Sequence, residues 1–171
     1  YEIVAVTVYD PAKIINRIID NLKLDTAIYD AKGADDKIRN ILFGDPPGQK
    51  WLVQERPYIA VAPGEPFELL DESTYVAKQG EQSPRTIITL QFFITCAVDG
   101  DTQEKALAKD LPFRILLKQF FKNNPKMSKA ADDSDPLFHR SKTIITPKFV
   151  RSKFDTTSLF TVILQADIPS E

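Results

Sequence analysis

Apolar side chains recur at intervals of three and four residues near the start of the chain. The repeating positions are Ile14, Ile15, Ile18, Ile19 and Leu22. This spacing puts one apolar stripe along a helix, which then packs on a core. Asp10 is a good N-cap, and Pro11 suits the first helical position, where an amide hydrogen has no partner. The pattern predicts an amphipathic helix over residues 10–22.

Two later stretches alternate between apolar and polar positions, as a half-buried strand does. In residues 86–98 the apolar side is Ile88, Leu90, Phe92, Ile94, Cys96 and Val98. The other side carries Thr89, Gln91 and Thr95, with Ile87 and Phe93 among them. Residues 158–168 repeat the alternation through Phe160, Val162, Leu164, Ala166 and Ile168. We expect both stretches in one antiparallel sheet.

The connecting stretches predict further elements. Residues 1–8 are rich in β-forming residues, and "ADDKIRNILFG" (34–44) has the acidic start and final glycine of a short helix. "RPYIAVAP" (56–63) is a short strand between prolines, which favour a strand end or a sheet edge. A further strand is expected over residues 142–151.

A second helical region follows the long strand and reaches about Lys122. Pro112 interrupts it, so a kink or a restart with Asp110 as a new N-cap is expected. Its expected apolar side is Leu107, Leu111, Leu116, Leu117, Phe120 and Phe121.

Together these elements predict a single α+β domain spanning residues 1–171. Its antiparallel or mixed sheet carries the helices on one face. A chain of this length buries enough surface to fold without disulfides or metals. Residues 63–85 and 123–137 are rich in Pro, Gly and polar residues, so we interpret them as mobile loops.

Composition narrows the function classes. The net charge of −2 shows no basic excess of the kind that marks nucleic-acid binding. One cysteine excludes an internal disulfide and a multi-cysteine zinc site. The apolar runs are shorter than the ~20 residues that a membrane span needs, and no signal peptide is visible.

The motifs that suggest chemistry have structural explanations. "VDGDT" (98–102) has a turn followed by Asp101 and Glu104 at capping-box spacing, and it lacks the further oxygen ligands of a calcium loop. "GDPPGQK" (44–50) has the wrong spacing for a phosphate loop. Nothing in the spacing brings Cys96 to His139, the single histidine. We therefore expect no catalytic residues, cofactor or metal, and no enzyme.

Charge separates sharply late in the chain. An acidic run, Asp132, Asp133 and Asp135, precedes a basic strand region with Arg140, Lys142, Lys148, Arg151 and Lys153. The basic side chains either protect an edge strand from unwanted pairing or form a charged contact surface. As a contact surface, the region favours another subunit over nucleic acid, because the interleaved aromatic residues of an RNA-binding sheet are absent.

The layout resembles the tail terminator (tail completion) proteins of long-tailed bacteriophages and related viruses. The resemblance rests on "PAKIINRIIDNL", "RPYIAVAP", "TLQFFITCAVDGDTQEKALAKDLPFRILLKQF" and the closing strands "KTIITPKFV" and "LFTVILQADI". It is a resemblance of pattern over most of the chain. It implies a non-enzymatic virion protein, assembled in the host cytoplasm, that forms a hexameric ring on the finished tail tube and joins the tail to the head-neck.

The implied partners are further copies of the chain, the tail tube protein and a head completion or connector protein, with DNA at most passing through the ring. The acidic run and the basic strand are candidates for the unlike faces that a ring contact brings together. One alternative is a neck, sheath-end or baseplate component of a contractile tail or injection machine. Another is a small α+β enzyme or ligand-binding module, in which Trp51, Tyr58 and Phe67 line a pocket.

Overall fold

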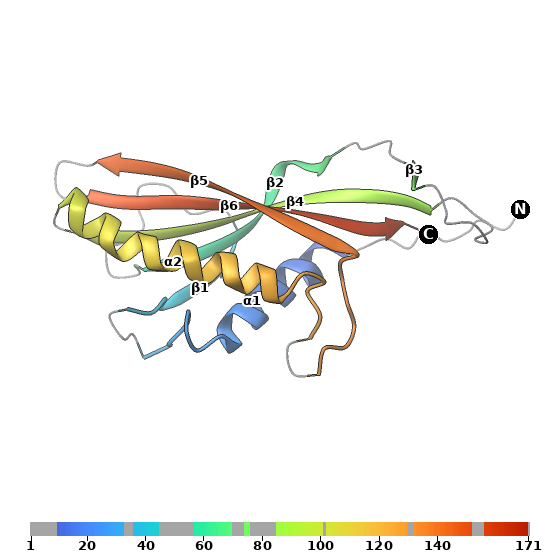
Figure 1. Ribbon diagram of the computed structural model, residues 1–171, viewed down its shortest axis with the longest axis horizontal. Helices are drawn as coiled ribbons and strands as arrows, with labels where there is room; N and C mark the ends of the chain where they lie inside the picture. Colours follow the sequence, from blue (N-terminus) through green and yellow to red (C-terminus); the bar gives the residue numbers. More distant parts are fainter. Residues whose placement is uncertain are drawn as a thin grey trace, which may run out of the picture.

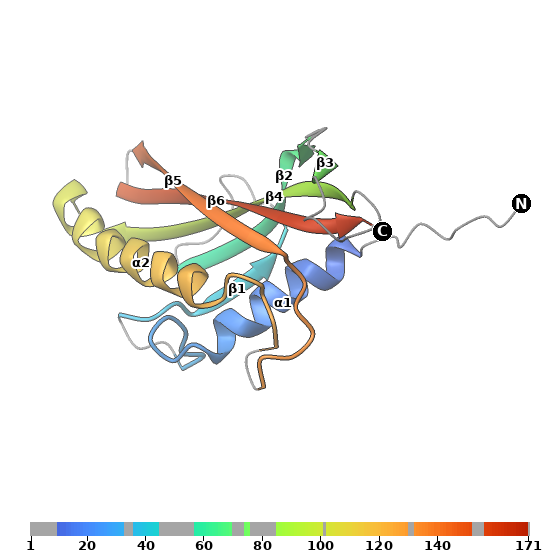
Figure 2. The ribbon, with the colours of Figure 1, turned by 45° about the vertical axis from the view of Figure 1, so that its right-hand side comes forward.

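A single sheet carries both helices on one of its faces (Figures 1 and 2). The computed structural model describes residues 10–32, 36–44, 57–69, 74–75, 85–100, 102–129, 132–151 and 156–170. The elements in chain order are α1 (Pro11–Leu24), β1 (Asn40–Phe43), β2 (Tyr58–Leu69), β3 (Thr74–Tyr75), β4 (Arg85–Gly100), α2 (Gln103–Asn123), β5 (Arg140–Arg151) and β6 (Thr156–Ser170). The β-rich stretch expected at residues 1–8 and the loop "DPPGQK" lie outside the described residues.

The strand order across the sheet is β1-β2-β4-β6-β5, and the short β3 pairs with β4. β1 and β2 run parallel, whereas the other paired neighbours run antiparallel, so the sheet is mixed. β4 and β6 lie at its centre and pair without a break from Thr86 opposite Ser170 to Gly100 opposite Thr156. The two strongest alternating stretches of the sequence therefore form the middle of one sheet, and the α+β fold class is confirmed.

The core lies between the sheet and the helices. The predicted apolar faces of β4 and β6 are buried there, and so are all five apolar positions of α1. α1 packs on β1 and β2, while α2 packs on β4, β5 and β6. Asp10 caps α1 as predicted, because its Oδ1 accepts a hydrogen bond from the Ala12 amide at 3.0 Å. The predicted first helix is thus confirmed in its start and its buried face.

α2 differs from its prediction in two respects. It is one continuous helix through Pro112, and Asp110 is a buried residue in its middle instead of a new N-cap. The missing amide of Pro112 leaves the carbonyl of Ala108 without its helical donor. Both residues are exposed, so water can reach that carbonyl. The helix starts after Thr102, whose Oγ1 accepts from the Lys105 amide at 3.2 Å, so the predicted capping role of Asp101 is wrong.

The predicted apolar side of α2 is also only partly right. Leu117, Phe120 and Phe121 are buried, but Leu111 is 47% exposed. Six residues advance a helix by ~600°, so Leu111 and Leu117 are separated by ~120° around the axis and lie on different sides. Ala106 and Phe113 occupy the buried side instead. α2 therefore has apolar residues on its outer surface as well as in the core.

The short helix predicted over residues 34–44 is wrong, because this stretch contains β1. The Ile38 amide donates to the Ile28 carbonyl at 2.7 Å, and residues 40–43 then pair with the start of β2. Ile38 and Ile41 are both buried. Their spacing of three fits a helix as well as an irregular strand, and backbone partners supplied by β2 decide between the two.

β2 is longer than predicted and continues into the region read as a loop. The pairing of β2 with β1 ends at Val61. Pro63 comes two residues later, where no described strand pairs with this edge of β2. The register with β4 then shifts between Pro63 and Glu68. A Cβ on Gly64 would lie 2.7 Å from Cγ of Gln91, so this close approach of two strands requires glycine. Among the described residues, no helix has the length and apolar character to cross a membrane.

Candidate interaction surfaces

One face of the sheet is not covered by either helix (Figure 1). The strand registers place the side chains of this face in rows across the strands. The central row is apolar and runs from Ile144 through Ile163 and Phe93 to Ala62. Ile144 is 48% exposed, Ile163 and Phe93 are half-buried, and Ala62 is buried. We call this row and the polar rows beside it the open face.

The polar rows of the open face are held by hydrogen bonds between strands. On one side of the apolar row, Gln165 donates to Gln91 at 3.3 Å, and Gln91 donates to the Pro66 carbonyl at 3.4 Å. On the other side the hydroxyls of Thr95 and Thr161 lie 3.2 Å apart. The open face therefore has an apolar row between polar rows, an order that resembles the anatomy of a protein interface. Gln91 and Thr95 are buried, as Ala62 is, so the exposed part of this face lies toward β5 and β6.

Two of the predicted basic residues lie on this face. Lys142 is exposed opposite Gln165, and Arg140 is exposed opposite Asp167. The Arg140 Nε donates to Oδ2 of Asp167, whose Oδ1 accepts from the Thr89 hydroxyl at 2.7 Å. Arg140 is therefore tied to the sheet, and Lys142 is the basic side chain beside the apolar row.

For two of the remaining predicted basic residues the structure describes the position of the backbone, and the third lies outside the described residues. Lys148 and Arg151 belong to β5, opposite Leu159 and Thr156. Lys153 lies outside the described residues.

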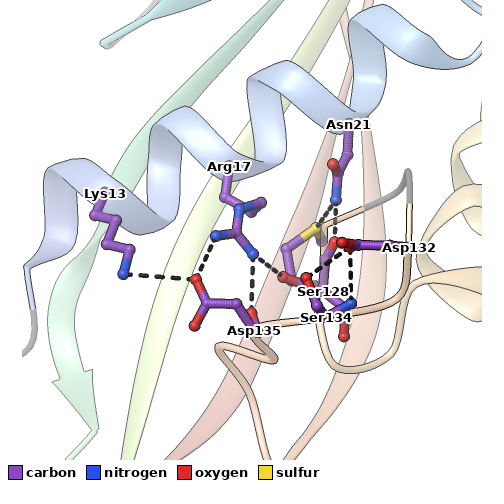
Figure 3. A network of polar contacts seen from close by, with 8 residues as sticks. Lys13, Arg17, Asn21, Ser128, Asp132, Ser134 and Asp135 are labelled. Carbon is purple, nitrogen blue, oxygen red and sulfur yellow. Dashed lines mark hydrogen bonds and ion pairs between the residues drawn. The ribbon is translucent and has the colours of Figure 1, made fainter.

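The predicted acidic residues lie on the helix side, in the turn that precedes β5 (Figure 3). Oδ1 of Asp132 accepts hydrogen bonds from the amide and the hydroxyl of Ser134, and these bonds lower the pKa of Asp132. Asp132 and Asp133 are exposed, and Asp133 has a positive φ of 55°. Asp135 points to α1 instead. The structure therefore does not bring these acids and the basic residues of the open face together.

Asp135 belongs to a network that joins this turn to α1, as Figure 3 shows. Arg17 donates to Oδ2 of Asp135 at 2.8 Å and to the carbonyls of Asp135 and Met127 at 2.9 and 3.2 Å. The Lys13 ammonium lies 3.7 Å from the same carboxylate. The hydrogen bond from Arg17, and next the charge of Lys13, lower the pKa of Asp135.

Asn21 continues this network one helical turn further along α1. Its amide donates to the Ser128 carbonyl at 2.9 Å and contacts the sulfur of Met127 at 3.4 Å. Met127 is fully buried, so the segment that composition marks as mobile packs on α1 through an apolar and several polar contacts. Sequence reasoning missed Arg17 and Asn21. The available signal was their spacing of four, directly beside the apolar stripe.

Cys96 and His139 lie far apart, as expected. Cys96 is opposite Phe160, whereas the His139 amide donates to the carbonyl of Asp167 at 2.8 Å, and Asp167 is opposite Thr89. Seven strand residues, or ~23 Å, separate Thr89 from Cys96. Cys96 is fully buried in the core, as its place in the alternating pattern predicts.

Beneath Cys96, α2 contributes a buried ion pair between Asp110 and Arg114. The Arg114 guanidinium also lies over the Phe160 ring, 5.5 Å from its centroid. Burial, and next the charge of Asp110, raise the pKa of the Cys96 thiol well above its ordinary value. The thiol is therefore kept neutral and behaves as an apolar core residue.

A small apolar pocket of about 250 Å³ lies between α2, the end of β4 and the start of β2. Its walls are Pro57, Val98, Ala108, Pro112 and Phe113, with Asp36 and Lys109 as its charged members. Tyr58 and Phe67, suggested by the sequence as pocket residues, pack in different apolar clusters. Trp51 lies outside the described residues. Within the described ranges, no three His, Cys, Asp or Glu residues are grouped as metal ligands.

Comparison with known proteins adds no family assignment. No protein-family model matches the sequence, and no curated protein matches it.

Proposed function

We propose that this chain is a virion assembly protein that closes the end of a bacteriophage-type tail tube as a ring and joins it to the head-neck. The proposal rests on the resemblance of sequence pattern and on one structural observation, the open face. Its apolar row is flanked by polar rows, and it lies on a sheet whose other face packs against the two helices and the segment before β5. Such a face suits docking to another protein surface more than chemistry.

The charged residues support a head-to-tail contact between copies. Lys142 lies on the open face, opposite Gln165. Asp132 and Asp133 are exposed in the segment that precedes β5, which lies on the helix side of the sheet (Figures 1 and 2). A ring of identical subunits joins unlike surfaces of neighbouring copies, and closure of the ring stops lateral growth. In this proposal the open face with Lys142 meets the acidic turn of the next copy, and opposite charges favour that register.

The test uses tail tubes of the virus that encodes this chain. Purified protein is added to tubes polymerised from the tail tube protein and imaged by negative stain. Rings at one end of each tube, and tubes that no longer elongate, are the expected result. Tubes that keep growing and carry no ring overturn the proposal. Binding to a neck or sheath particle in place of the tube end favours the alternative of a neck or sheath-end component.

A variant pair connects this assay to the open face. Lys142→Glu combined with Ile144→Glu places two carboxylates on the exposed border and centre of that face. Capping of tubes should fall by at least tenfold, because a buried unpaired charge opposes docking by ~2 kcal/mol or more. Leu111→Glu combined with Lys118→Glu, which changes an exposed apolar residue and an exposed lysine of α2, is the matched control and should cap normally. Equal capping by both variants contradicts the role of the open face.

A further inference from the structure

α2 lies at the outside of the fold, and no described element covers its outer surface (Figure 2). That surface carries exposed apolar residues. Leu111 is 47% and Ile115 is 60% exposed, so each keeps about half of its surface in water. Both lie on the side of the helix opposite Phe113 and Leu117, which are buried in the core. α2 is therefore apolar on two sides, and only one of them has a partner within the domain.

The residues above and below this patch continue it at regular spacing. The full row is Glu104, Ala108, Leu111, Ile115, Lys118 and Lys122, and every member is exposed. The intervals alternate between four and three residues, which is the spacing of the contact positions in a coiled coil. We call this row the α2 seam. It lies on the helix side of the domain and is distinct from the open face.

The charges of the α2 seam select its partner. Its apolar residues are in the middle, its acid is at the N-terminal end and its two lysines are at the C-terminal end. If two copies lie antiparallel, Leu111 faces Ile115 of the other copy, and Glu104 faces Lys122 at both ends. A parallel pair would instead put Glu104 against Glu104 and Lys122 against Lys122, which repel. The seam is complementary to itself in the antiparallel direction.

From this pattern we propose that α2 is a self-association surface, which pairs two copies of the chain about a two-fold axis through an antiparallel α2–α2 contact. The occupant of the seam is a second copy, because the same six residues supply both halves of the charge pairing. The contact goes beyond the proposed ring function, since a two-fold pair uses the same surface on both copies whereas a ring uses unlike surfaces. A seam of one helix pair lies at the small end of interface sizes, so the dimer is weak and depends on concentration.

Sedimentation velocity of the purified chain, at protein concentrations from ~10 µM to ~1 mM, tests the proposal. The upper concentration allows a dimer with a dissociation constant as weak as ~1 mM to be detected. The wild type should move from monomer to dimer over this range. Leu111→Glu and Ile115→Glu should each leave a monomer at the highest concentration, because each puts a carboxylate into the apolar centre twice per dimer. Ile144→Glu, an equally exposed apolar position on the open face, is the matched control and should dimerise as the wild type does.

A charge exchange tests the antiparallel register. Glu104→Lys alone should weaken the dimer several-fold, because the introduced ammonium of one copy then faces Lys122 of the other at both ends. Lys122→Glu alone should do the same. The double variant Glu104→Lys/Lys122→Glu should return to within about twofold of the wild type. The two residues lie ~27 Å apart along one helix, so an exchange within a single copy cannot explain recovery.

Three outcomes overturn the proposal: a wild type that stays monomeric at the highest concentration, glutamate variants at Leu111 and Ile115 that dimerise normally, or a double exchange that stays as weak as the single changes. Far-ultraviolet circular dichroism and thermal unfolding of each variant show that it is folded. The tube-capping assay reports separately on the proposed function, and Leu111→Glu should cap tubes normally. Loss of the dimer and loss of capping are thus distinguishable.

Discussion

The two helices lie on the same face of one sheet, yet they use their surfaces in opposite ways. α1 buries a single apolar stripe, and its outer positions Lys13, Asn16 and Asp20 are polar, whereas its last residue, Leu24, is 63% exposed. Beside that stripe, Arg17 and Asn21 hold the segment before β5. α2 buries apolar residues and also exposes Leu111 and Ile115. Along its length α1 therefore has one apolar side, which is buried, and exposes an apolar residue only at its end, whereas α2 exposes apolar residues in its middle.

The buried polar side chains of the two helices differ in where their partners lie. Arg17 of α1 makes several bonds to a neighbouring segment and anchors it. The buried carboxylate of Asp110 is paired within α2 itself, with Arg114 one turn further on. A buried charge is costly unless it is paired, and here Arg114, which also lies over the Phe160 ring of β6, pairs with Asp110 where α2 packs on the sheet. The comparison indicates that α2 carries its own countercharge for the buried Asp110, whereas Leu111 and Ile115 on its outer surface are left exposed.

The largest effect is expected at the buried ion pair of α2. Arg114→Met leaves the Asp110 carboxylate in the core without its arginine, which should cost about 3–5 kcal/mol of unfolding free energy. Urea denaturation followed by circular dichroism measures the loss. Asp110→Leu combined with Arg114→Met removes both charges and should recover most of that stability. A double variant as unstable as the single one would mean that packing, and not the buried charge, sets the cost.

The next effect separates the two apolar surfaces directly. Ile18→Ala in the buried stripe of α1 should cost about 2–5 kcal/mol, because it leaves a cavity in the core. Leu111→Ala on the outer surface of α2 should change the unfolding free energy by less than about 0.5 kcal/mol. Both are measured by urea denaturation at ~10 µM protein, below the concentrations at which the proposed weak dimer forms. A large loss in Leu111→Ala would show that this residue already has a partner within the chain.

The smallest effect concerns the network of α1 and depends on pH. The pKa of Asp135 is lowered in the folded chain, first by the Arg17 hydrogen bond. The unfolded chain therefore takes up a proton on this group at higher pH than the folded chain does. The stabilisation is present above pH ~4 and is lost as the pH falls through the folded pKa.

Asp135→Asn removes this titration. The urea midpoint of the wild type should exceed that of the variant at pH ~6, and the difference should shrink toward pH ~3. Asp133→Asn, in the same turn, is the control. A difference between wild type and Asp135→Asn that is constant with pH would contradict the ion pair with Arg17.

Local patterns predicted most of the fold because they state which side of an element is apolar. The alternation in β4 and β6 and the stripe in α1 each identify a buried face, and each is confirmed. The prediction at residues 34–44 was wrong because Ile38 and Ile41 are too few to define a period, and pairing with β2 supplied the backbone bonds. The prediction that Leu111 is on the buried side of α2 was wrong because this helix has apolar residues on two sides. With two apolar sides, the spacing in the sequence does not show which residues share the buried one.

The candidate surfaces were less accessible to sequence reasoning. The basic residues Arg140 and Lys142 were identified, but Arg140 is bound to Asp167, a partner 27 residues away in the chain. The acidic run was treated as one unit, whereas Asp135 contacts Arg17 and Asp132 closes its own turn. Which charged side chain is held by the fold, and which is left for a partner, depends on neighbours that are distant in sequence.

By itself, the sequence determined the α+β class, the first helix with its cap, and the buried faces of the two central strands, because periodicity and capping act between residues a few positions apart. Only the tertiary structure decided the order of the strands, the uncovered side of the sheet, the anchoring of the segment before β5 and the exposure of the α2 seam. These features depend on which elements meet, and that choice is made by burial and hydrogen bonding summed over the whole domain.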